Sequence, residues 1–292
     1  MKRCTNCNAS FEGAKWVCPS CGFSPPMIEG IPNFAPEFSE QSDGYDPTRY
    51  ETVSRFERTY FWFRGRNSLI KKQLRKYFSQ ADLILEIGCG TGQVLRAIRE
   101  ALPIARLHGT EINTSGLKYA RKQMPEVEFL QIDARNIPIR DHFDVVCAFD
   151  VIEHIEEDCK VLEQMYAACK PGGGIIITVP QHPWLWSYKD EVACHKRRYT
   201  RGELQKKVSD AGFLVIKTTS FVSLLLPLMY LSRRRQHSAK STDLEGEYRI
   251  SPLLNQLFLF CSRIENGLIH AGANLQFGGS LLLLAIKENH LL

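Results

Sequence analysis

The sequence predicts an α/β fold with a doubly wound, parallel sheet, preceded by a small metal-binding unit. Two observations support this prediction. From residue 83 onward, apolar strand-like runs alternate with helix-length segments, and strands interleaved with helices build parallel sheets. Before residue 22, four cysteines stand in two close pairs, which is the spacing of a tetrahedral metal site.

The bulk composition is that of an ordinary globular protein. A length of 292 residues suits one large unit plus one small unit, and a hydrophobic share of 44% leaves ample material for a core. The net charge of +5 permits a polyanionic partner without requiring one. No apolar run approaches the roughly 18–20 residues that cross a bilayer. We expect no secretory signal, because no apolar stretch follows the positive charge of residues 1–4. Most of the ten cysteines are scattered, so we expect a cytoplasmic protein.

The paired cysteines predict a zinc ribbon over residues 1–34. Two Cys-x-x-Cys knuckles place four thiolates around one ion, and so short a segment needs the metal in order to fold. Iron in a rubredoxin-like site and a redox dithiol are the alternatives. The predicted ligands are Cys4, Cys7, Cys18 and Cys21.

The rest of the chain divides into an entry segment and a main domain. Residues 35–80 form a proline-marked linker followed by a helical stretch, and residues 81–292 form the α/β domain. Helices are expected over segments such as 93–100 and 158–169. The expected strands cover residues 83–87, 106–110, 127–132, 143–149, 174–180, 213–218 and 280–287.

A helical insertion, about 221–272, separates the last two expected strands. Residues 221–231 are apolar on nearly every side and are followed by Arg233, Arg234 and Arg235. One interpretation is a helical cap on the sheet or a dimer contact. The other is a lipid-facing surface or a lid over a lipid-linked substrate, which would make the protein peripheral to the membrane. An apolar stripe of a second helix comprises Ile250, Leu253, Leu254, Leu257, Phe258, Cys261, Ile264 and Leu268.

A glycine-rich turn follows the first strand of the main domain. Residues 83–92 read as a buried strand, a turn and a helix start, so backbone N–H groups can approach a ligand. Glu111 ends the next strand, where a carboxylate can bind ribose hydroxyls. A nicotinamide enzyme would carry a third glycine at the position of Gln93, and this chain does not.

The spacing Gly-x-Gly-x-Gly, preceded by Glu86, resembles motif I of class I S-adenosylmethionine-dependent methyltransferases. Residues 131–134, 143–150 and 170–174 resemble further landmarks of that family in the same order. The resemblance spans roughly residues 60–220 and the last strand. It implies a Rossmann-like seven-stranded sheet, mostly parallel with the last strand antiparallel, and S-adenosylmethionine as the cofactor.

The resemblance also implies a set of cofactor-binding residues. Glu86 would approach the ammonium group of the cofactor, Glu111 would hold the ribose, and Asp133 would bind the adenine amino group. Ile112 would pack on adenine, and Arg66 resembles an arginine that some relatives place on the cofactor carboxylate. The full predicted set is Arg66, Glu86, Gly88, Gly90, Gly92, Glu111, Ile112, Asp133, Ala134, Phe149 and Asp150.

Three histidines are candidates for the catalytic role. His182 and His195 lie in a loop with two tryptophans and a basic cluster, where a general base and a stacking platform can form. Glu153 and His154 follow the fourth strand and resemble a cluster that ubiquinone-pathway O-methyltransferases and small-RNA methyltransferases use for a divalent metal. The second histidine of the RNA enzymes is replaced here by Asp158.

The sequence is compatible with more than one class of methyl acceptor. The histidine loop and the helical insertion resemble methyltransferases of bacterial cell-surface polysaccharide and glycolipid clusters, which implies O-methylation of a small-molecule, sugar or lipid-linked acceptor. The rival is an RNA methyltransferase that recognises its substrate with the zinc ribbon. The ribbon offers Lys2, Arg3 and Lys15 against Glu12 and Glu29, a weak footprint for nucleic acid. A third alternative is a binding module without turnover.

Overall fold

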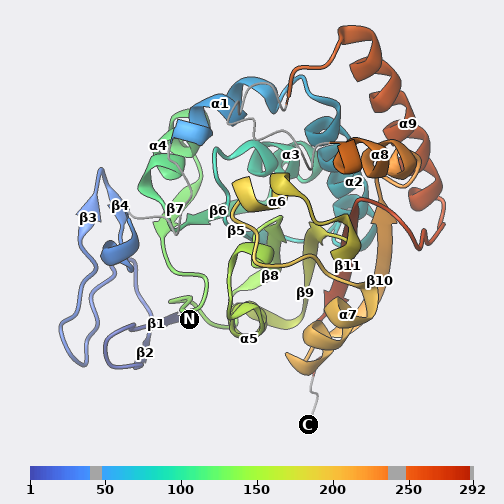
Figure 1. The fold of residues 1–292 in the computed structure, drawn as a ribbon. Coiled ribbons are helices and arrows are strands. Elements are labelled where there is room, and N and C mark those ends of the chain that lie inside the picture. Colours follow the sequence, from blue (N-terminus) through green and yellow to red (C-terminus); the bar gives the residue numbers. More distant parts are fainter. Residues whose placement is uncertain (40–47, 236–247, 290–292) are drawn as a thin grey trace.

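The computed structural model describes residues 1–39, 48–235 and 248–289 of the chain, and these form a sheet covered by helices on both faces (Figure 1). The strand order is β10-β11-β9-β8-β5-β6-β7. The strands are β5 (Leu83–Ile87), β6 (Arg106–Glu111), β7 (Glu128–Gln131), β8 (Phe143–Phe149), β9 (Cys169–Pro180), β10 (Leu214–Phe221) and β11 (Ser280–Ile286).

The pairing confirms a seven-stranded, mostly parallel sheet. β5 pairs in parallel with both β6 and β8, and the parallel ladder continues to β7 on one side and β9 on the other. β11 lies antiparallel between β9 and β10. The central strands are buried on both faces, as parallel sheets covered by helices require.

Helices cover each face of the sheet with a separate apolar cluster. One cluster includes Leu69, Leu95 and Leu117, and the other includes Leu162 and Leu204. The first face carries α2 (Phe61–Tyr77), α3 (Gln93–Ala101) and α4 (Thr114–Gln123), and the second carries α5 (Asp158–Ala168) and α7 (Arg201–Asp210). Shorter elements are α1 (Thr48–Phe56), α6 (Tyr188–Val192), η1 (Pro36–Phe38), η2 (Ile152–His154) and η3 (Pro183–Leu185).

The N-terminal unit consists of two small hairpins and lies beside the β7 edge of the sheet (Figure 1). The hairpins are β1 (Lys2–Arg3) with β2 (Ser10–Phe11), and β3 (Met27–Ile28) with β4 (Ile31–Pro32). The Arg3 N–H donates to the Pro138 carbonyl at 2.9 Å, and Asn33 bridges to Gln131. The unit is therefore fixed to the main domain by backbone hydrogen bonds.

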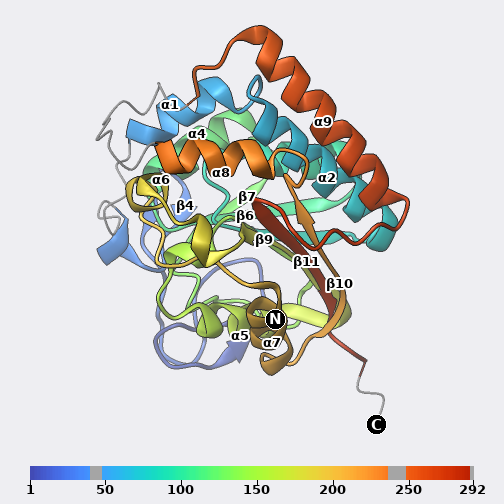
Figure 2. The same ribbon diagram turned by 45° about the vertical axis from the view of Figure 1, so that its right-hand side comes forward.

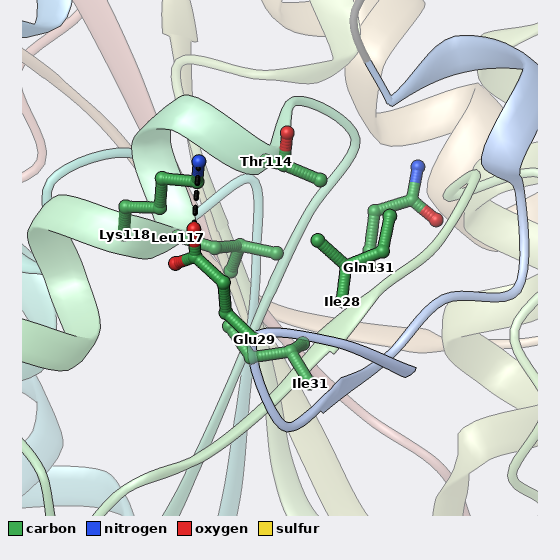
Figure 3. A pocket seen from close by; sticks show the side chains of 7 residues that line it. All are labelled: Ile28, Glu29, Ile31, Thr114, Leu117, Lys118 and Gln131. Atoms are coloured by element: carbon green, nitrogen blue, oxygen red, sulfur yellow. Dashed lines mark ion pairs between the residues drawn. The ribbon is translucent and has the colours of Figure 1, made fainter. Parts of the chain in front are cut away.

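A small, solvent-open hollow marks the seam between the N-terminal unit and α4 (Figure 3). Ile31 and Leu117 contribute apolar walls, and Glu29 pairs with Lys118 at 2.9 Å across its mouth. The hollow lies beside α4, away from the predicted catalytic histidines. We therefore regard it as a packing seam.

The insertion forms α8 (Leu226–Arg235) and α9 (Pro252–His270), both at the end of the molecule where α2 lies (Figures 1 and 2). The predicted apolar stripe of the second helix is present, but it does not face the sheet as a whole. Phe258 and Cys261 pack partly inward, whereas Leu253, Ile264 and Leu268 are exposed to solvent. Residues 236–247, between the two helices, lie outside the described residues.

The expected helical entry segment forms two helices, because Tyr60 adopts an extended backbone between α1 and α2. Strand β9 starts five residues earlier than predicted, since Cys169 already pairs with Phe143 and the register shifts before Val145 pairs with Gly174.

Candidate active site

The glycine turn after β5 adopts a backbone that side chains disfavour. Gly88, Gly90 and Gly92 have φ values of 65°, 50° and 81°, in the region that glycine enters without steric cost. A Cβ atom on Gly88 would stand 2.5 Å from a methyl group of Val151, in the segment after β8. The turn is therefore packed tightly at the carboxyl ends of the strands and leads into the N-terminus of α3.

Two predicted carboxylates are buried beside this turn. Glu86 is 1% exposed, and its Oε2 atom has no hydrogen-bond partner among the described residues. Burial raises the pKa of Glu86 well above its ordinary value, and the charge of Arg66 only partly opposes this. Glu111 accepts hydrogen bonds from the N–H groups of Gly90 at 3.0 Å and Ile112 at 2.8 Å. Burial also raises the pKa of Glu111.

Arg66 and Asp150 form a partly buried ion pair at the end of β8. The Nη1 atom of Arg66 lies 2.6 Å from the Oδ2 atom of Asp150, which also accepts from the Thr178 hydroxyl at 3.1 Å. The guanidinium of Arg66 stacks over the Trp62 ring at 4.7 Å. Arg66 was predicted to bind a cofactor carboxylate, and α2 does bring it to the strand ends.

Further predicted cofactor-binding residues lie at or just after the ends of β6, β7 and β8. Ala134 and Phe149 are buried, and Ile112 is half-buried. The Asp133 carboxylate is held by Arg135, with N–O distances from 2.8 to 3.0 Å. Its role toward an adenine amino group stays a prediction. In that role the Asp133 carboxylate would bind both Arg135 and the amino group.

Sequence reasoning missed three residues near the glycine turn. The Thr91 hydroxyl donates to the buried carboxylate of Glu57 at 2.6 Å, and burial raises the pKa of Glu57. The Tyr50 hydroxyl hydrogen-bonds Glu111 and helps to keep its carboxylate ionised. Tyr50 lies in α1 and Glu57 directly follows this helix, and no motif spacing relates them to the turn. A folded structure was needed to find them.

His195 is oriented by a buried carboxylate. Its Nδ1 atom lies 2.9 Å from the Oδ1 atom of Asp190, which is 1% exposed. Asp190 also binds Arg198 Nε at 2.7 Å and Arg233 Nη1 at 2.8 Å. Burial opposes ionisation of Asp190, but the hydrogen bond from His195 and the two arginine charges outweigh it and hold its pKa below the ordinary range.

His154 lies against His195 and forms a cluster with Glu153. The two imidazole centroids are 4.8 Å apart, and one ligand atom from each of the three residues lies within 4.8 Å of the others. Glu153 is fully buried, and its carboxylate accepts no hydrogen bond from another described residue. Burial and then the Asp150 charge raise its pKa. This donor set could hold a divalent cation.

The position of the second RNA-enzyme histidine is used differently here. Asp158 accepts a hydrogen bond from the Tyr199 hydroxyl at 2.6 Å and pairs with Lys207 at 2.6 Å. Its carboxylate therefore belongs to a structural network beneath the loop.

His182 stands in an aromatic stack. Its ring lies 4.8 Å from Trp184 and 5.8 Å from Phe277, nearly parallel to both. Its backbone has a positive φ of 64°, and its buried Nε2 atom lacks a hydrogen-bond partner among the described residues. Burial, followed by the charge of Arg198, lowers the pKa of His182. The structure thus brings His154 and His195 together, whereas His182 packs among aromatic side chains.

The four cysteines of the N-terminal unit converge as predicted. The sulfur atoms of Cys4 and Cys21 are 3.6 Å apart, as are those of Cys7 and Cys18, and all four lie within 4.8 Å of one another. Tetrahedral zinc with Zn–S bonds of about 2.3 Å separates its sulfurs by about 3.8 Å. The donor set therefore fits one zinc ion.

Comparison with known proteins agrees with this geometry. Residues 85–175 match a family model described as a methyltransferase domain. The chain is 26% identical over 161 residues to a probable S-adenosylmethionine-dependent methyltransferase of Mycolicibacterium smegmatis, a match covering 54% of this chain and 61% of that protein. A second protein of the same name from Mycobacterium tuberculosis is 25% identical over 197 residues, covering 62% of this chain and 70% of that protein.

The fold likeness extends beyond the matched family segment. A structure of Haemonchus contortus phosphoethanolamine N-methyltransferase 2 in complex with S-adenosylmethionine has a TM-score of 0.57 and 20% identity, covering 86% of this chain and 59% of that one. At this identity the likeness concerns the fold. Together with the match of residues 85–175 to a methyltransferase-domain model, it shows that the chain has the fold of S-adenosylmethionine-dependent methyltransferases.

Proposed function

We propose that this chain transfers the methyl group of S-adenosylmethionine to a hydroxyl oxygen of a small-molecule, sugar or lipid-linked acceptor. One observation gives the strongest support for S-adenosylmethionine as the cofactor. Glu57, Glu86 and Glu111 are buried close together, and burial raises the pKa of each. A cationic ligand would stabilise their ionised forms, whereas the pyrophosphate of a dinucleotide would be repelled.

The residues at the turn fit S-adenosylmethionine. The unpartnered Oε2 atom of Glu86 is suited to bind an ammonium group. The carboxylate of Glu111 is suited to bind ribose hydroxyls, which would replace its hydrogen bond with the Tyr50 hydroxyl. Arg66 can bind a carboxylate while it keeps its contact with Asp150. The bound cofactor supplies an electrophilic methyl group, so the main task of the chain is to orient the acceptor.

His195 is the residue we assign as general base. Its Nδ1 atom points to Asp190, which leaves Nε2 to take the proton of an acceptor hydroxyl. Asp190 fixes the tautomer and stabilises the imidazolium that forms, as a buried carboxylate does in other base-orienting pairs. His154 contacts His195 and would restrict how its ring moves.

A divalent cation on Glu153, His154 and His195 is the alternative way to activate the hydroxyl. It would lower the pKa of the acceptor instead of removing its proton with a histidine. Assays with and without a chelator separate the two mechanisms. Removal of the cation stops turnover only if the cation activates the hydroxyl.

The RNA alternative receives less support from the N-terminal unit. The Nζ atom of Lys2 donates to the carbonyls of Gly13 and Ala14, and Arg3 is buried against Asn8 and Ile137. Both side chains are thus engaged in contacts within the protein, which leaves fewer cationic groups to bind phosphates.

The acceptor class is tested by incubating a cell extract with the purified protein and cofactor labelled on the methyl group. We expect label in the small-molecule or lipid fraction, in a product stable to conditions that cleave methyl esters. Label in RNA would overturn the acceptor assignment but leave the methyl transfer intact. No label in any fraction, with cofactor binding retained, would favour a binding module.

A further inference from the structure

Both helices of the insertion present a row of apolar side chains to solvent. α9 carries an outward row at helical spacing whose members are between 45% and 81% exposed, although a surface helix normally turns this stripe to the core. The row comprises Leu253, Leu257, Phe260, Ile264 and Leu268. Leu224, Leu228 and Leu231, leading into and along α8, are about half exposed at the same spacing.

The inward side of α9 buries Leu259 and Ile269 and also makes polar contacts. Asn266 donates to the carbonyl of Gly65 at 2.8 Å. Asn255 accepts from the Phe61 N–H at 2.8 Å and donates to the Thr59 carbonyl at 2.9 Å. Because hydrogen bonds hold the helix to α2, its outward leucines are presented on a firmly attached element.

Glu265 ties the two helices together. Its buried carboxylate accepts from the backbone N–H groups of Val222, Ser223 and Leu224, at 2.5, 2.6 and 3.0 Å. These residues lead into α8, so the start of α8 is fixed on α9. The two helices therefore form one unit at the same end of the molecule (Figure 2).

The charges of the two helices favour an anionic surface. Their sequences hold four arginines and a single carboxylate, Glu265, which is buried and used internally. Arg263 is exposed, whereas Arg233 is already paired with Asp190. A symmetric contact with a second copy would bring the same cations together. Trp184, 55% exposed, lies edge-on to Tyr230 of α8, and such aromatic residues favour the interface between lipid and water.

We propose that α8 and α9 lie on an anionic lipid bilayer, with their outward leucines inserted at the boundary between headgroups and acyl chains. No helix among the described residues is long and apolar enough to span a membrane, so the attachment would be peripheral. The histidine loop with Trp184 would then face the lipid surface, where a lipid-linked acceptor would arrive. The lipid contact itself does not depend on the proposed methyl transfer.

The test is sedimentation of the full-length protein with vesicles. One set is phosphatidylcholine alone, and the other contains phosphatidylglycerol at one third. We expect binding to the anionic vesicles that falls at least tenfold in the variant Leu257→Ser with Phe260→Ser. The matched control is Ile104→Ser, which removes an apolar side chain that is 90% exposed between α3 and β6.

Melting temperature and cofactor affinity verify that each variant is folded. The proposal is overturned if the unaltered protein binds neither vesicle, if it binds both equally, or if Ile104→Ser weakens binding as much as the double substitution. A dimer in lipid-free solution that becomes monomeric in the double variant would instead identify a second copy as the occupant. Because vesicle binding needs no turnover, its failure is separate from failure of the proposed reaction.

Discussion

The cofactor side and the acceptor side of the candidate site are built in different ways. On the cofactor side, Glu86, Gly88 and Gly90 lie within one strand and turn, and Glu111 ends the neighbouring strand. On the acceptor side, His195, Asp190 and Arg233 come from a loop, a short helix and the insertion. A local arrangement of this kind can be recognised from spacing, whereas a network assembled from distant segments cannot. The difference also predicts that substitutions on the two sides will affect different steps.

The largest expected effect is on turnover. His195→Ala should lower kcat by about 10²–10⁴-fold, because a positioned general base contributes that much. Cofactor affinity should be unchanged, as measured by calorimetry, since His195 lies on the acceptor side. His182→Ala provides the comparison and should act mainly on KM through the aromatic stack. Unchanged kcat in His195→Ala would remove the base assignment.

Cofactor binding should show the next largest effect. Glu111→Ala should raise the Kd for S-adenosylmethionine roughly tenfold to a hundredfold, because hydrogen bonds to a charged group contribute about 1.5–3 kcal/mol. Glu100→Ala is the control, since that carboxylate is exposed on α3 and pairs with Lys71. Equal affinities in the two variants would contradict the proposed ribose site.

The pH dependence of cofactor affinity should be smaller and should depend on Glu86. The folded-state pKa of Glu86 is raised above its ordinary value of 4.5, so a cationic ligand must displace its proton. Affinity should therefore rise with pH above 4.5, by at most about tenfold per pH unit, and level off above the raised pKa. Stability of the ligand-free protein should fall over the same window, because the folded state binds the extra proton.

Calorimetry in buffers of different ionisation enthalpy measures the proton released on binding. Glu86→Gln should bind more weakly and lose the part of the pH dependence that Glu86 causes. An identical pH profile in both proteins would show that Glu86 does not face the cofactor cation.

The smallest effect on the site is expected from the N-terminal unit. Cys18→Ser should remove one zinc per chain, measured by metal analysis, and unfold the unit, because structural zinc supplies about 10–16 kcal/mol of apparent binding energy. Cofactor affinity should change least in this variant. Cys159→Ser, which alters an exposed cysteine elsewhere, should keep the metal. Zinc retained in Cys18→Ser would contradict the ribbon.

The sequence allowed the sheet to be predicted well and the insertion only in part. All seven strands were located, since buried apolar runs and turn residues are local signals. The outward direction of Leu253 and Leu268 was not predictable, because a stripe shows which residues share a face but not what that face contacts. Likewise, no sequence motif marks Asp190 as a functional residue. Its partners Arg198 and Arg233 are brought to it only by tertiary packing.

The position of β11 has a consequence for how the chain folds during synthesis. This strand is made after the insertion, yet it fills the gap between β9 and β10. Until it emerges from the ribosome, both neighbours present open edges, which are prone to pair with other chains. Completion of the sheet must await contacts between residues about a hundred positions apart, and such distant contacts slow folding. We expect emergence of β11, rather than synthesis of the glycine turn, to limit the appearance of a binding-competent protein.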